Sequence, residues 1–495
     1  MPPIVQAAPE QEEETIAAAP TKLRALAELP GPPGWPIVGN ALQMDRERIH
    51  QNMEALCDQY GSFFKVRFAS RTVLVVADHE ATAKILKARP SDFRRSMRLS
   101  EAAHSLGLEM GLFMAEGDTW NRQRRMVMAS FAPQRIRSYF PSMLNVTRRL
   151  HDRWLKAAQN QQAIDLQADL MLYTVDTITG LALGHDVNSL QADGDVIQRH
   201  LDVIFPAMFK RILSVVRYWK VIKLPSDREV ERHVAQVNRA IDGFVAQARQ
   251  RLQQDPARRE EPSNLLEAFI VAAESEGGGV SDADVKGNVM TMLLAGEDTT
   301  ANTLAWLIYL LKQNPATLER ARAEVKEVAP NGMADFTPET MARLDYLDAC
   351  ANEAMRLKPV APFLPVQAIH DVTVADIAVP AGTLIWNVMR RDCISEQHLT
   401  NAKAFQPERW LASGQSQVKH LSMPFGSGPR ICPGRYLAML EIKMALAMLL
   451  SHFDIMAVDT PDGTEAKELM AFTMGPEGLS MSLRPRPAST EATSN

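Results

Sequence analysis

Hydrophobic residues recur at the three- to four-residue spacing of amphipathic α-helices along most of the chain. This spacing predicts helices over 46–60, 80–88, 118–130, 133–158, 166–182, 228–253, 263–275, 281–313, 315–328, 338–357 and 434–450. Alternating or β-branched runs are short, and they predict strands at 63–67, 72–76, 373–376, 383–386 and 479–483. We therefore expect a mainly α fold with small β-sheets, an α+β arrangement.

No internal repeat and no long linker interrupts residues 29–485, so we expect one large domain there. Residues 1–28, rich in Ala, Pro and Glu, and residues 486–495 are expected to be disordered tails. The first 20 residues contain four glutamates and no lysine or arginine, which fits neither a secretory signal nor a transit peptide. The longest uncharged stretches, such as Thr299–Leu311, are too short to cross a bilayer. These features predict a soluble, cytoplasmic protein.

Composition narrows the class of protein further. With 46% hydrophobic residues the 495-residue chain can bury a large core, and its net charge of −5 gives no reason to expect nucleic acid as a partner. The sequence contains no P-loop, dinucleotide-binding, zinc-protease or hydrolase motif, so these chemistries lose support. None of the four cysteines lies within four residues of another, which argues against a zinc ribbon or a redox pair and favours a reducing compartment.

Three of the four cysteines fit as small hydrophobic residues in or near the core, but Cys432 differs from them. It lies in a glycine-rich stretch, 424–434, directly before the last expected helix. The positive end of the helix dipole and the nearby Arg430 are expected to lower the pKa of its thiol. The pattern predicts a thiolate that binds a metal or acts as a nucleophile. The alternative is a tight turn that contains a cysteine by chance.

The stretch Phe425-x-x-Gly428-x-Arg430-x-Cys432-x-Gly434 resembles the haem-binding loop of the cytochrome P450 family, the haem-thiolate monooxygenases. The resemblance covers about residues 29–485 and implies the fold of that family, with one long helix crossing the haem. Cys432 would then be the proximal ligand of the iron in haem b (iron protoporphyrin IX). Phe425, Gly426 and Gly434 would contact the cofactor.

A second stretch, Ala295-Gly296-Glu297-Asp298-Thr299-Thr300, interrupts an apolar helical pattern with a glycine and two acids. It resembles the central helix of the family. There Ala295 and Gly296 would leave room for dioxygen, Thr299 would hydrogen-bond it, and Asp298 would relay protons. Glu297 is expected to lie on an exposed acidic face and is given no chemical role.

Two further motifs follow the order of the family. Glu353-x-x-Arg356 places two charges on one helix face, and with Arg409 these residues would form a buried ionic triad that supports the cysteine loop. The alternative is an ordinary surface pair with little effect on stability. Trp120-x-x-x-Arg124, together with Arg430, would donate hydrogen bonds to the haem propionates.

One position departs from the family pattern. Many relatives place an arginine against a haem propionate where this chain has Gln367. An amide can donate a hydrogen bond but carries no charge. His370 or Arg390 could compensate for the missing charge.

The resemblance implies a monooxygenase that inserts one oxygen atom of O2 into a small hydrophobic substrate such as a lipid or terpenoid. We expect a family member without a fused reductase, which takes electrons from a separate ferredoxin or flavodoxin-type donor docking near Arg122, Arg125 and Arg435. A monomer is expected. A peroxide-driven peroxygenase or a non-enzymatic haem sensor are the alternatives.

By resemblance, the substrate pocket should be built from residues 93–116, 200–222, 288–299, 361–366 and 471–475. Its expected lining is apolar and rich in methionine, which suits a hydrophobic guest. The candidates are Met97, Phe113, Met114, Phe205, Met208, Phe209, Met292, Ala295, Phe363, Leu364, Phe472 and Met474. The segment 205–224 is expected to serve as a lid over the pocket, with contact to a membrane surface as the alternative.

Overall fold

The computed structural model describes residues 23–184, 188–191, 196–214, 216–274, 280–411 and 415–487. Most of the tails expected to be disordered, residues 1–22 and 488–495, lie outside the described residues. Residues 24–28 were assigned to the first tail but form strand β1 (Arg24–Ala25) and a 3-10 helix. Strand β1 pairs in parallel with β8 (Ile377–Val379), and an ion pair between Arg24 and Asp376 ties it to the fold.

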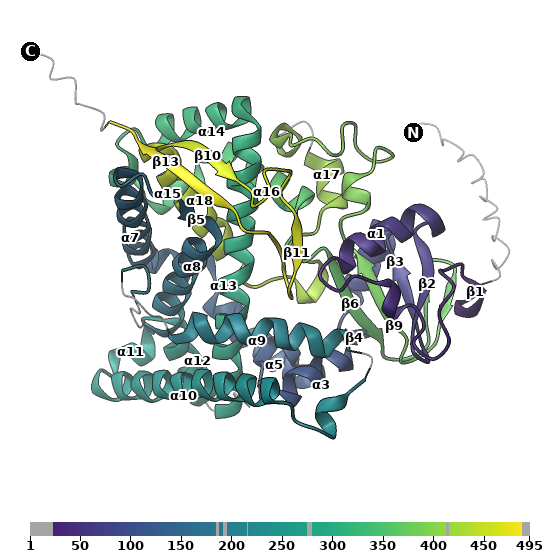
Figure 1. Ribbon diagram of the computed structural model, residues 1–495. Helices are drawn as coiled ribbons and strands as arrows, with labels where there is room; N and C mark the ends of the chain where they lie inside the picture. Colours follow the sequence, from purple (N-terminus) through teal and green to yellow (C-terminus); the bar gives the residue numbers. More distant parts are fainter. Residues whose placement is uncertain are drawn as a thin grey trace, which may run out of the picture.

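The molecule consists of a large helical part and a smaller β-rich part that lie side by side (Figure 1). The longest helix, α13 (Asp282–Gln313), passes through the middle of the helical part. The remaining helices are α1 (Ile49–Tyr60), α2 (His79–Lys87), α3 (Met97–Ser105), α4 (Gly111–Met114), α5 (Gly117–Ser130), α6 (Pro133–Ser138), α7 (Phe140–Gln159), α8 (Leu166–Leu183), α9 (Val196–Leu213), α10 (Pro225–Gln254), α11 (Ala257–Glu260), α12 (Leu265–Glu274), α14 (Pro315–Val328), α15 (Pro338–Ala342), α16 (Asp345–Leu357), α17 (Gln415–Leu421) and α18 (Arg435–His452).

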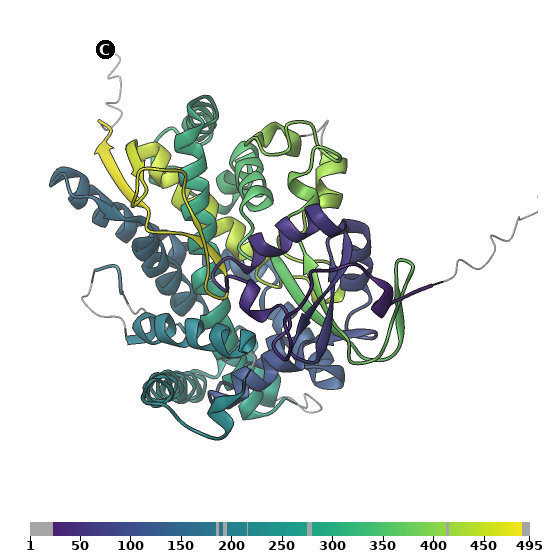
Figure 2. The same cartoon turned by 45° about the vertical axis from the view of Figure 1, so that its right-hand side comes forward.

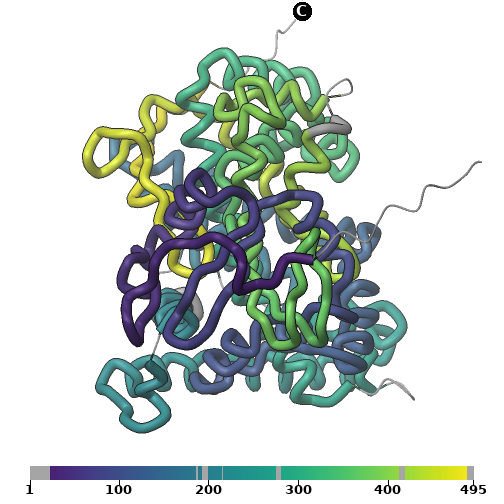
Figure 3. The backbone as a smooth tube through the Cα atoms, turned by 90° about the vertical axis from the view of Figure 1, so that its right-hand side faces the viewer, coloured from purple at the N-terminus to yellow at the C-terminus, as the bar shows by residue number. Residues whose placement is uncertain are grey.

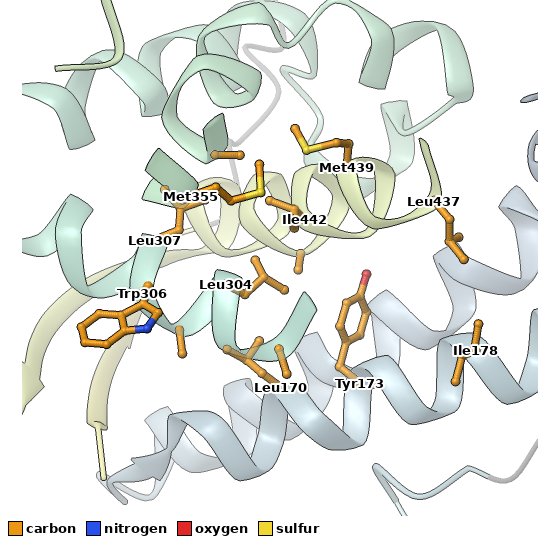
Figure 4. Close-up of a cluster of buried hydrophobic side chains, with 14 of the residues drawn as sticks. Leu170, Tyr173, Ile178, Leu304, Trp306, Leu307, Met355, Leu437, Met439 and Ile442 are labelled. Atoms are coloured by element: carbon orange, nitrogen blue, oxygen red, sulfur yellow. The ribbon is translucent and has the colours of Figure 1, made fainter. Parts of the chain in front are cut away.

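Helix α13 is buried along most of its length because apolar residues occur on all of its faces. It begins at a capping box, in which the Ser281 hydroxyl accepts a hydrogen bond from the Asp284 N–H at 3.2 Å, and Pro315 follows its end. Helices α8 and α18 pack against it, and Figure 4 shows Tyr173 of α8, Leu304 of α13 and Ile442 of α18 meeting in this core. The core therefore fixes the central helix on the helix that follows the cysteine loop.

The β-rich part contains a five-stranded sheet of order β2-β3-β9-β6-β4. Its strands are β2 (Phe63–Phe68), β3 (Arg71–Val76), β4 (Phe93–Arg95), β6 (Phe363–Ala368) and β9 (Leu384–Val388). Strands from the first hundred residues thus pair with strands that follow residue 360, and Figures 2 and 3 show the purple and green segments interleaved. The smaller sheets contain β5 (Ile164–Asp165), β7 (Val372–Val374), β8, β10 (Phe453–Asp459), β11 (Glu468–Met470), β12 (Met474–Pro476) and β13 (Ser480–Pro485).

The mainly α fold with small sheets was predicted correctly, and most helix bounds agree within three residues. Several expectations differ from the structure, and the short helices α3, α4, α11 and α17 were not predicted. The single helix expected over 133–158 is split into α6 and α7, and the one expected over 338–357 is split into α15 and α16. Helix α9 was not predicted at all, because it contains Pro206 and mixes apolar with charged residues. In the described part of the chain, no helix has the length and apolarity to span a membrane.

Candidate active site

A cavity of about 1320 Å³ lies between α13, the N-terminal part of α18 and the inner edge of the five-stranded sheet. Cys432 borders it from one side, and Ala295, Gly296 and Thr299 of α13 border it from another. Most of its lining is apolar. The residues expected to surround a haem therefore meet at one cavity, although more than 300 positions separate the first from the last.

The loop before α18 holds Cys432 at the surface of this cavity. The Cys432 N–H donates to the Phe425 carbonyl at 2.9 Å, which closes the loop. Gly426 (φ 73°) and Gly428 (φ 71°) adopt the left-handed conformation that favours glycine. A Cβ at Gly428 would lie 2.7 Å from the Leu86 carbonyl oxygen, so the loop can pack on α2 only with glycine there. Gly434 has an ordinary φ of −81° and needs no such freedom.

Cys432 is the one exposed cysteine of the four, and its exposed surface borders the cavity. Enclosure by the surrounding protein raises the pKa of its thiol, whereas the backbone N–H groups of Gly434 and Arg435 and the charge of Arg124 act in the opposite direction. Cys57, Cys350 and Cys393 are buried, in keeping with their interpretation as small hydrophobic residues.

Helix α13 presents small residues and several threonines to the cavity. Ala295, Gly296 and Thr299 all line it, and the Thr299 hydroxyl donates to the Ala295 carbonyl at 2.9 Å. Glu297 is 2% exposed, and its backbone carbonyl accepts a hydrogen bond from the Thr174 hydroxyl of α8. The expectation of an exposed acidic face was therefore wrong, because Glu297 is buried in the core.

Asp298 does not border the cavity among the residues described, although it adjoins Thr299 in sequence. Its carboxylate accepts hydrogen bonds from the Asn302 amide at 2.6 Å and from the Thr473 hydroxyl. Burial raises the pKa of Asp298, and these two hydrogen bonds oppose the rise. Thr473 does line the cavity, so it lies between the carboxylate and the cavity.

A group of cationic side chains lines the end of the cavity beside Trp120. Arg124 and Arg430, expected from the sequence, lie there, and the Arg430 guanidinium stands 4.8 Å from the centre of the Trp120 ring. Arg430 is also paired with Glu116 and donates to the Ala115 carbonyl at 2.8 Å.

Two further arginines, Arg89 and Arg95, line the same part of the cavity and were missed by the sequence analysis. The sequence feature that could have identified them is a positive charge at the end of an apolar stretch. Arg89 follows α2, and Arg95 ends strand β4. Within the described part of the chain, Arg89 Nε and Nη2, Arg95 Nε and Arg430 Nε are buried without a hydrogen-bond partner. Burial and the neighbouring positive charge of Arg430 lower the pKa of Arg89 to about 10.

The residues proposed to replace the missing arginine at position 367 lie elsewhere. His370 is an exposed residue beside Asp92, and Arg390 is buried in an ion pair with Glu54 and Glu468. Gln367 does line the cavity, but its amide nitrogen donates to the Gly382 carbonyl at 2.9 Å. The expected compensation is therefore wrong, because both side chains are held by other carboxylates.

Glu353 and Arg356 lie together in the core beneath the loops that lead to Cys432. Both side chains are completely buried, with Arg356 Nη2 2.7 Å from Glu353 Oε1. Arg409 Nε lies 3.4 Å from the same carboxylate oxygen. The Trp410 indole N–H and the Gln406 backbone N–H also donate to Glu353. The carboxylate thus connects α16 to the segment around η6 (Pro407–Trp410).

Most residues of the expected pocket line the cavity, and four do not. Met97, Phe113, Phe209, Met292, Phe363, Leu364 and Phe472 line it, as does Ala295. Among the described residues, Met114, Phe205, Met208 and Met474 are not part of the lining. Met208 and Met474 are fully buried in the main core, and Phe205 stacks behind Phe472 with ring centres 5.5 Å apart. The sequence pattern did not show which face of each helix or strand points to the cavity, so these four residues were placed wrongly.

A mainly helical fold in which a cysteine thiol faces a large apolar cavity, opposite a helix with small residues, defines the site of a haem-thiolate protein. The chain matches the family model described as Cytochrome P450 over residues 29–483, and it therefore belongs to the cytochrome P450 family. Haem b is the cofactor of this family.

The relatives and solved structures that the chain resembles agree with this assignment. It is 28% identical to the self-sufficient cytochrome P450 monooxygenase CYP505E5 of Aspergillus niger, over 91% of this chain and 42% of the relative. It is 29% identical to the self-sufficient monooxygenase CYP505AG1 of Oidiodendron maius, over 89% of this chain and 40% of the relative. The crystal structure of the cytochrome P450DA heme domain matches with a TM-score of 0.81 and 25% identity, covering 94% of this chain and 99% of that one.

These relatives correct one expectation. We expected a family member without a fused reductase, but the curated relatives are self-sufficient monooxygenases. The chain spans about two-fifths of their length.

Proposed function

We propose that the protein is a haem-thiolate monooxygenase that inserts one oxygen atom of O2 into a hydrophobic organic substrate. The observation that carries the proposal is the single exposed thiol of Cys432, which borders a large apolar cavity across from Ala295, Gly296 and Thr299. When bound, the haem supplies the activation of dioxygen. The overall reaction consumes two electrons and two protons for each dioxygen molecule and releases one oxygen atom as water.

The residues around the cavity fit the cofactor. Cys432 would provide the thiolate ligand of the iron, and Phe425 and the loop glycines would pack against one haem face. The haem carries two propionates, and the cavity offers Arg124, Arg430 and the Trp120 indole next to them. Arg89 and Arg95 add buried guanidinium nitrogens that have no partner in the described part of the chain. Propionates there would satisfy these nitrogens, and Arg89 and Arg95 would supply the positive charge that Gln367 lacks.

The α13 residues would handle dioxygen and protons. The Thr299 hydroxyl lies in the cavity lining and can reorient from the Ala295 carbonyl to hydrogen-bond dioxygen. Asp298 would supply protons from behind the lining. An acid and a threonine arranged in this way favour an oxygenase over a peroxide-driven enzyme or a haem sensor, because neither alternative requires proton delivery to dioxygen.

Three arginines at the other end of the cavity narrow the class of substrate. Arg71 is exposed and Arg98 and Arg217 are half-buried, so this group lies where the cavity meets solvent. Burial, followed by the charges of Arg217 and Arg71, lowers the pKa of Arg98. Arg217 is paired with Glu101 at 3.0 Å, which leaves an excess of positive charge. An amphipathic substrate with an anionic head and an apolar tail fits both the arginines and the lining.

An electron donor is required, and we propose that it docks where Arg125 and Arg435 are exposed, on the outer side of α5 and α18. Arg122 contributes to the same face but already donates to Thr119 at 3.2 Å. Arg125→Glu should slow electron transfer at low ionic strength, and unchanged reduction kinetics would refute this docking face. The described part of the segment 205–224 would form the lid, with the exposed side chains of Val221 and Ile222 available for contact with apolar surfaces. A monomer and a cytoplasmic location stay predictions.

The proposed function is tested in two steps. The reduced, CO-bound protein should show the red-shifted Soret band of thiolate ligation, and Cys432→His should lose it. Turnover should then yield an oxygenated product with O2 and an electron donor. Product formed only with hydrogen peroxide would favour a peroxygenase, and spectral binding with no product under either condition would favour a sensor.

The substrate class is tested by comparing a long-chain carboxylate with its methyl ester. The carboxylate should bind more tightly by about tenfold, as expected for one charge-assisted hydrogen bond. Arg71→Ala and Arg98→Ala should remove this preference without changing the affinity of the ester. Equal affinities in the unaltered protein would refute the anionic head.

A further inference from the structure

The Asp298 carboxylate has no direct path to the cavity, and the side chain between them is that of Thr473. Asp298 is absent from the cavity lining among the described residues, whereas Thr473 is part of it. The Thr473 hydroxyl donates to Asp298 Oδ2. A hydroxyl can accept one proton while it releases another, so it can carry protons between two groups that do not touch.

Asn302 holds this carboxylate in place. It donates to Asp298 Oδ1 at 2.6 Å, and it accepts a hydrogen bond from Gln167 at 3.1 Å. The backbone of Gly475 closes on the same side chain, since a Cβ there would lie 2.4 Å from Asn302 Oδ1. Asn302 is 3% exposed, so the carboxylate is bound to a side chain that itself cannot move. One oxygen of Asp298 is therefore fixed, and the other is available to Thr473.

The backbone before Thr473 is strained. Phe472 has a φ of 133°, which is rare for a residue with a side chain and marks sites of functional constraint. Its ring lines the cavity between Phe113 and Phe205, with ring centres 6.5 and 5.5 Å away. The Phe472 ring thus belongs to the cavity lining and directly precedes Thr473 in the chain.

We propose that Thr473 positions the Asp298 carboxylate and passes its protons to the cavity. Asp298 in its acid form gives its proton to the Thr473 oxygen, while the hydroxyl proton of Thr473 moves on toward the cavity. Asp298 then regains a proton from solvent. The proposal rests on the proposed monooxygenase function, in which two protons are consumed for each dioxygen.

The test compares Thr473→Val, which keeps the shape and removes the hydroxyl, with Thr473→Ser, which keeps the hydroxyl. In the haem-loaded protein, Thr473→Val should lower the fraction of electrons recovered in product by about tenfold, with a matching rise in hydrogen peroxide. It should also change the solvent deuterium isotope effect on oxygen consumption. Thr473→Ser should keep both the recovery of electrons in product and the isotope effect within about twofold of the unaltered protein. Thr179→Val, a buried hydroxyl on α8 whose hydrogen bonds stay within its own helix, is the matched control.

A second readout does not depend on turnover. The infrared carboxylic-acid band that disappears in Asp298→Asn should shift in Thr473→Val and stay in place in Thr179→Val. A Val variant with unchanged coupling and an unchanged band would overturn the proposal. Absence of any oxygenated product from the unaltered protein would instead overturn the proposed function, so the two failures are distinguishable.

Discussion

Replacing Glu353 with alanine is expected to cause a large loss of stability that a surface ion pair with the same spacing does not show. Glu353 and Arg356 are completely buried, and Arg356 donates two hydrogen bonds of 2.7 Å to the carboxylate. Trp410 and Gln406 donate two more, at 2.9 and 3.0 Å. The substitution leaves the Arg356 charge in the core and removes the acceptor of four donors.

The expected magnitude follows from this geometry. Breaking a buried ion pair by removing one partner costs about 3–5 kcal/mol, because the remaining charge stays desolvated. In the variant, Arg356 keeps hydrogen bonds to the carbonyls of Ala402 and Ala404, at 2.6 and 3.2 Å. The loss of folding free energy should therefore lie near the lower end of this range. A domain is typically stable by only about 5–15 kcal/mol, so this loss removes a large share. Because the carboxylate supports the segment leading to Cys432, haem retention should fall as well.

The assay is denaturant unfolding of the purified protein, combined with the ratio of haem to protein absorbance. Glu319→Ala is the matched control, since Glu319 pairs with Arg322 at the same i, i+3 spacing but its side chain is 66% exposed. The control should lose less than about 1 kcal/mol. A Glu353→Ala protein with normal haem content and a stability loss as small as the control would refute the buried-triad reasoning.

Three further predictions concern glycine geometry and acid stability. Gly428→Ala should retain less haem and lose about 2–5 kcal/mol of folding free energy, since the added Cβ would meet the backbone of α2 and the φ of Gly428 is positive. Gly434→Ala should lose less than about 1 kcal/mol, because the atom nearest to its added Cβ would lie 3.8 Å away. Equal shifts of the melting temperature in the two variants would contradict this ranking. Although burial works to raise the pKa of Glu468, hydrogen bonds from His50 and Arg390 lower it below the ordinary value, so its stabilisation is present above about pH 4.3 and lost as the pH falls. In Glu468→Gln, the free energy of unfolding should depend less steeply on pH in this acidic range. An unchanged slope of unfolding free energy against pH would argue against this role of Glu468. Burial and His151 lower the pKa of His452 to about 4, so folding stability should fall as the pH drops from about 6.5 toward 4, and His452→Gln should remove that component of the slope.

The elements with the longest hydrophobic periodicity were predictable because their burial depends on local spacing. Helix α13 was expected over 281–313 and is found at Asp282–Gln313, where it begins at a capping box. Helix α9 was missed because its apolar face is interrupted by charge and by Pro206, and only packing against α10 and α3 gives it a place. The hairpin of β7 and β8 was expected as one short strand, because the turn at Ala375 depends on a left-handed backbone conformation.

The sequence by itself determined the chemistry that the protein can carry, because the cysteine loop, the acid–threonine stretch and the Glu-x-x-Arg pair are local patterns whose residue types set their function. It could not determine which charges face the cavity. Arg89 and Arg95 were overlooked, and Arg390 was considered instead, because charge orientation depends on pairings such as that of Arg390 with Glu468, 78 residues away. Nor could it separate Asp298 from the cavity or place Thr473 between them. Those contacts join segments 175 residues apart, and only the packing of the β11–β12 turn on α13 brings them together.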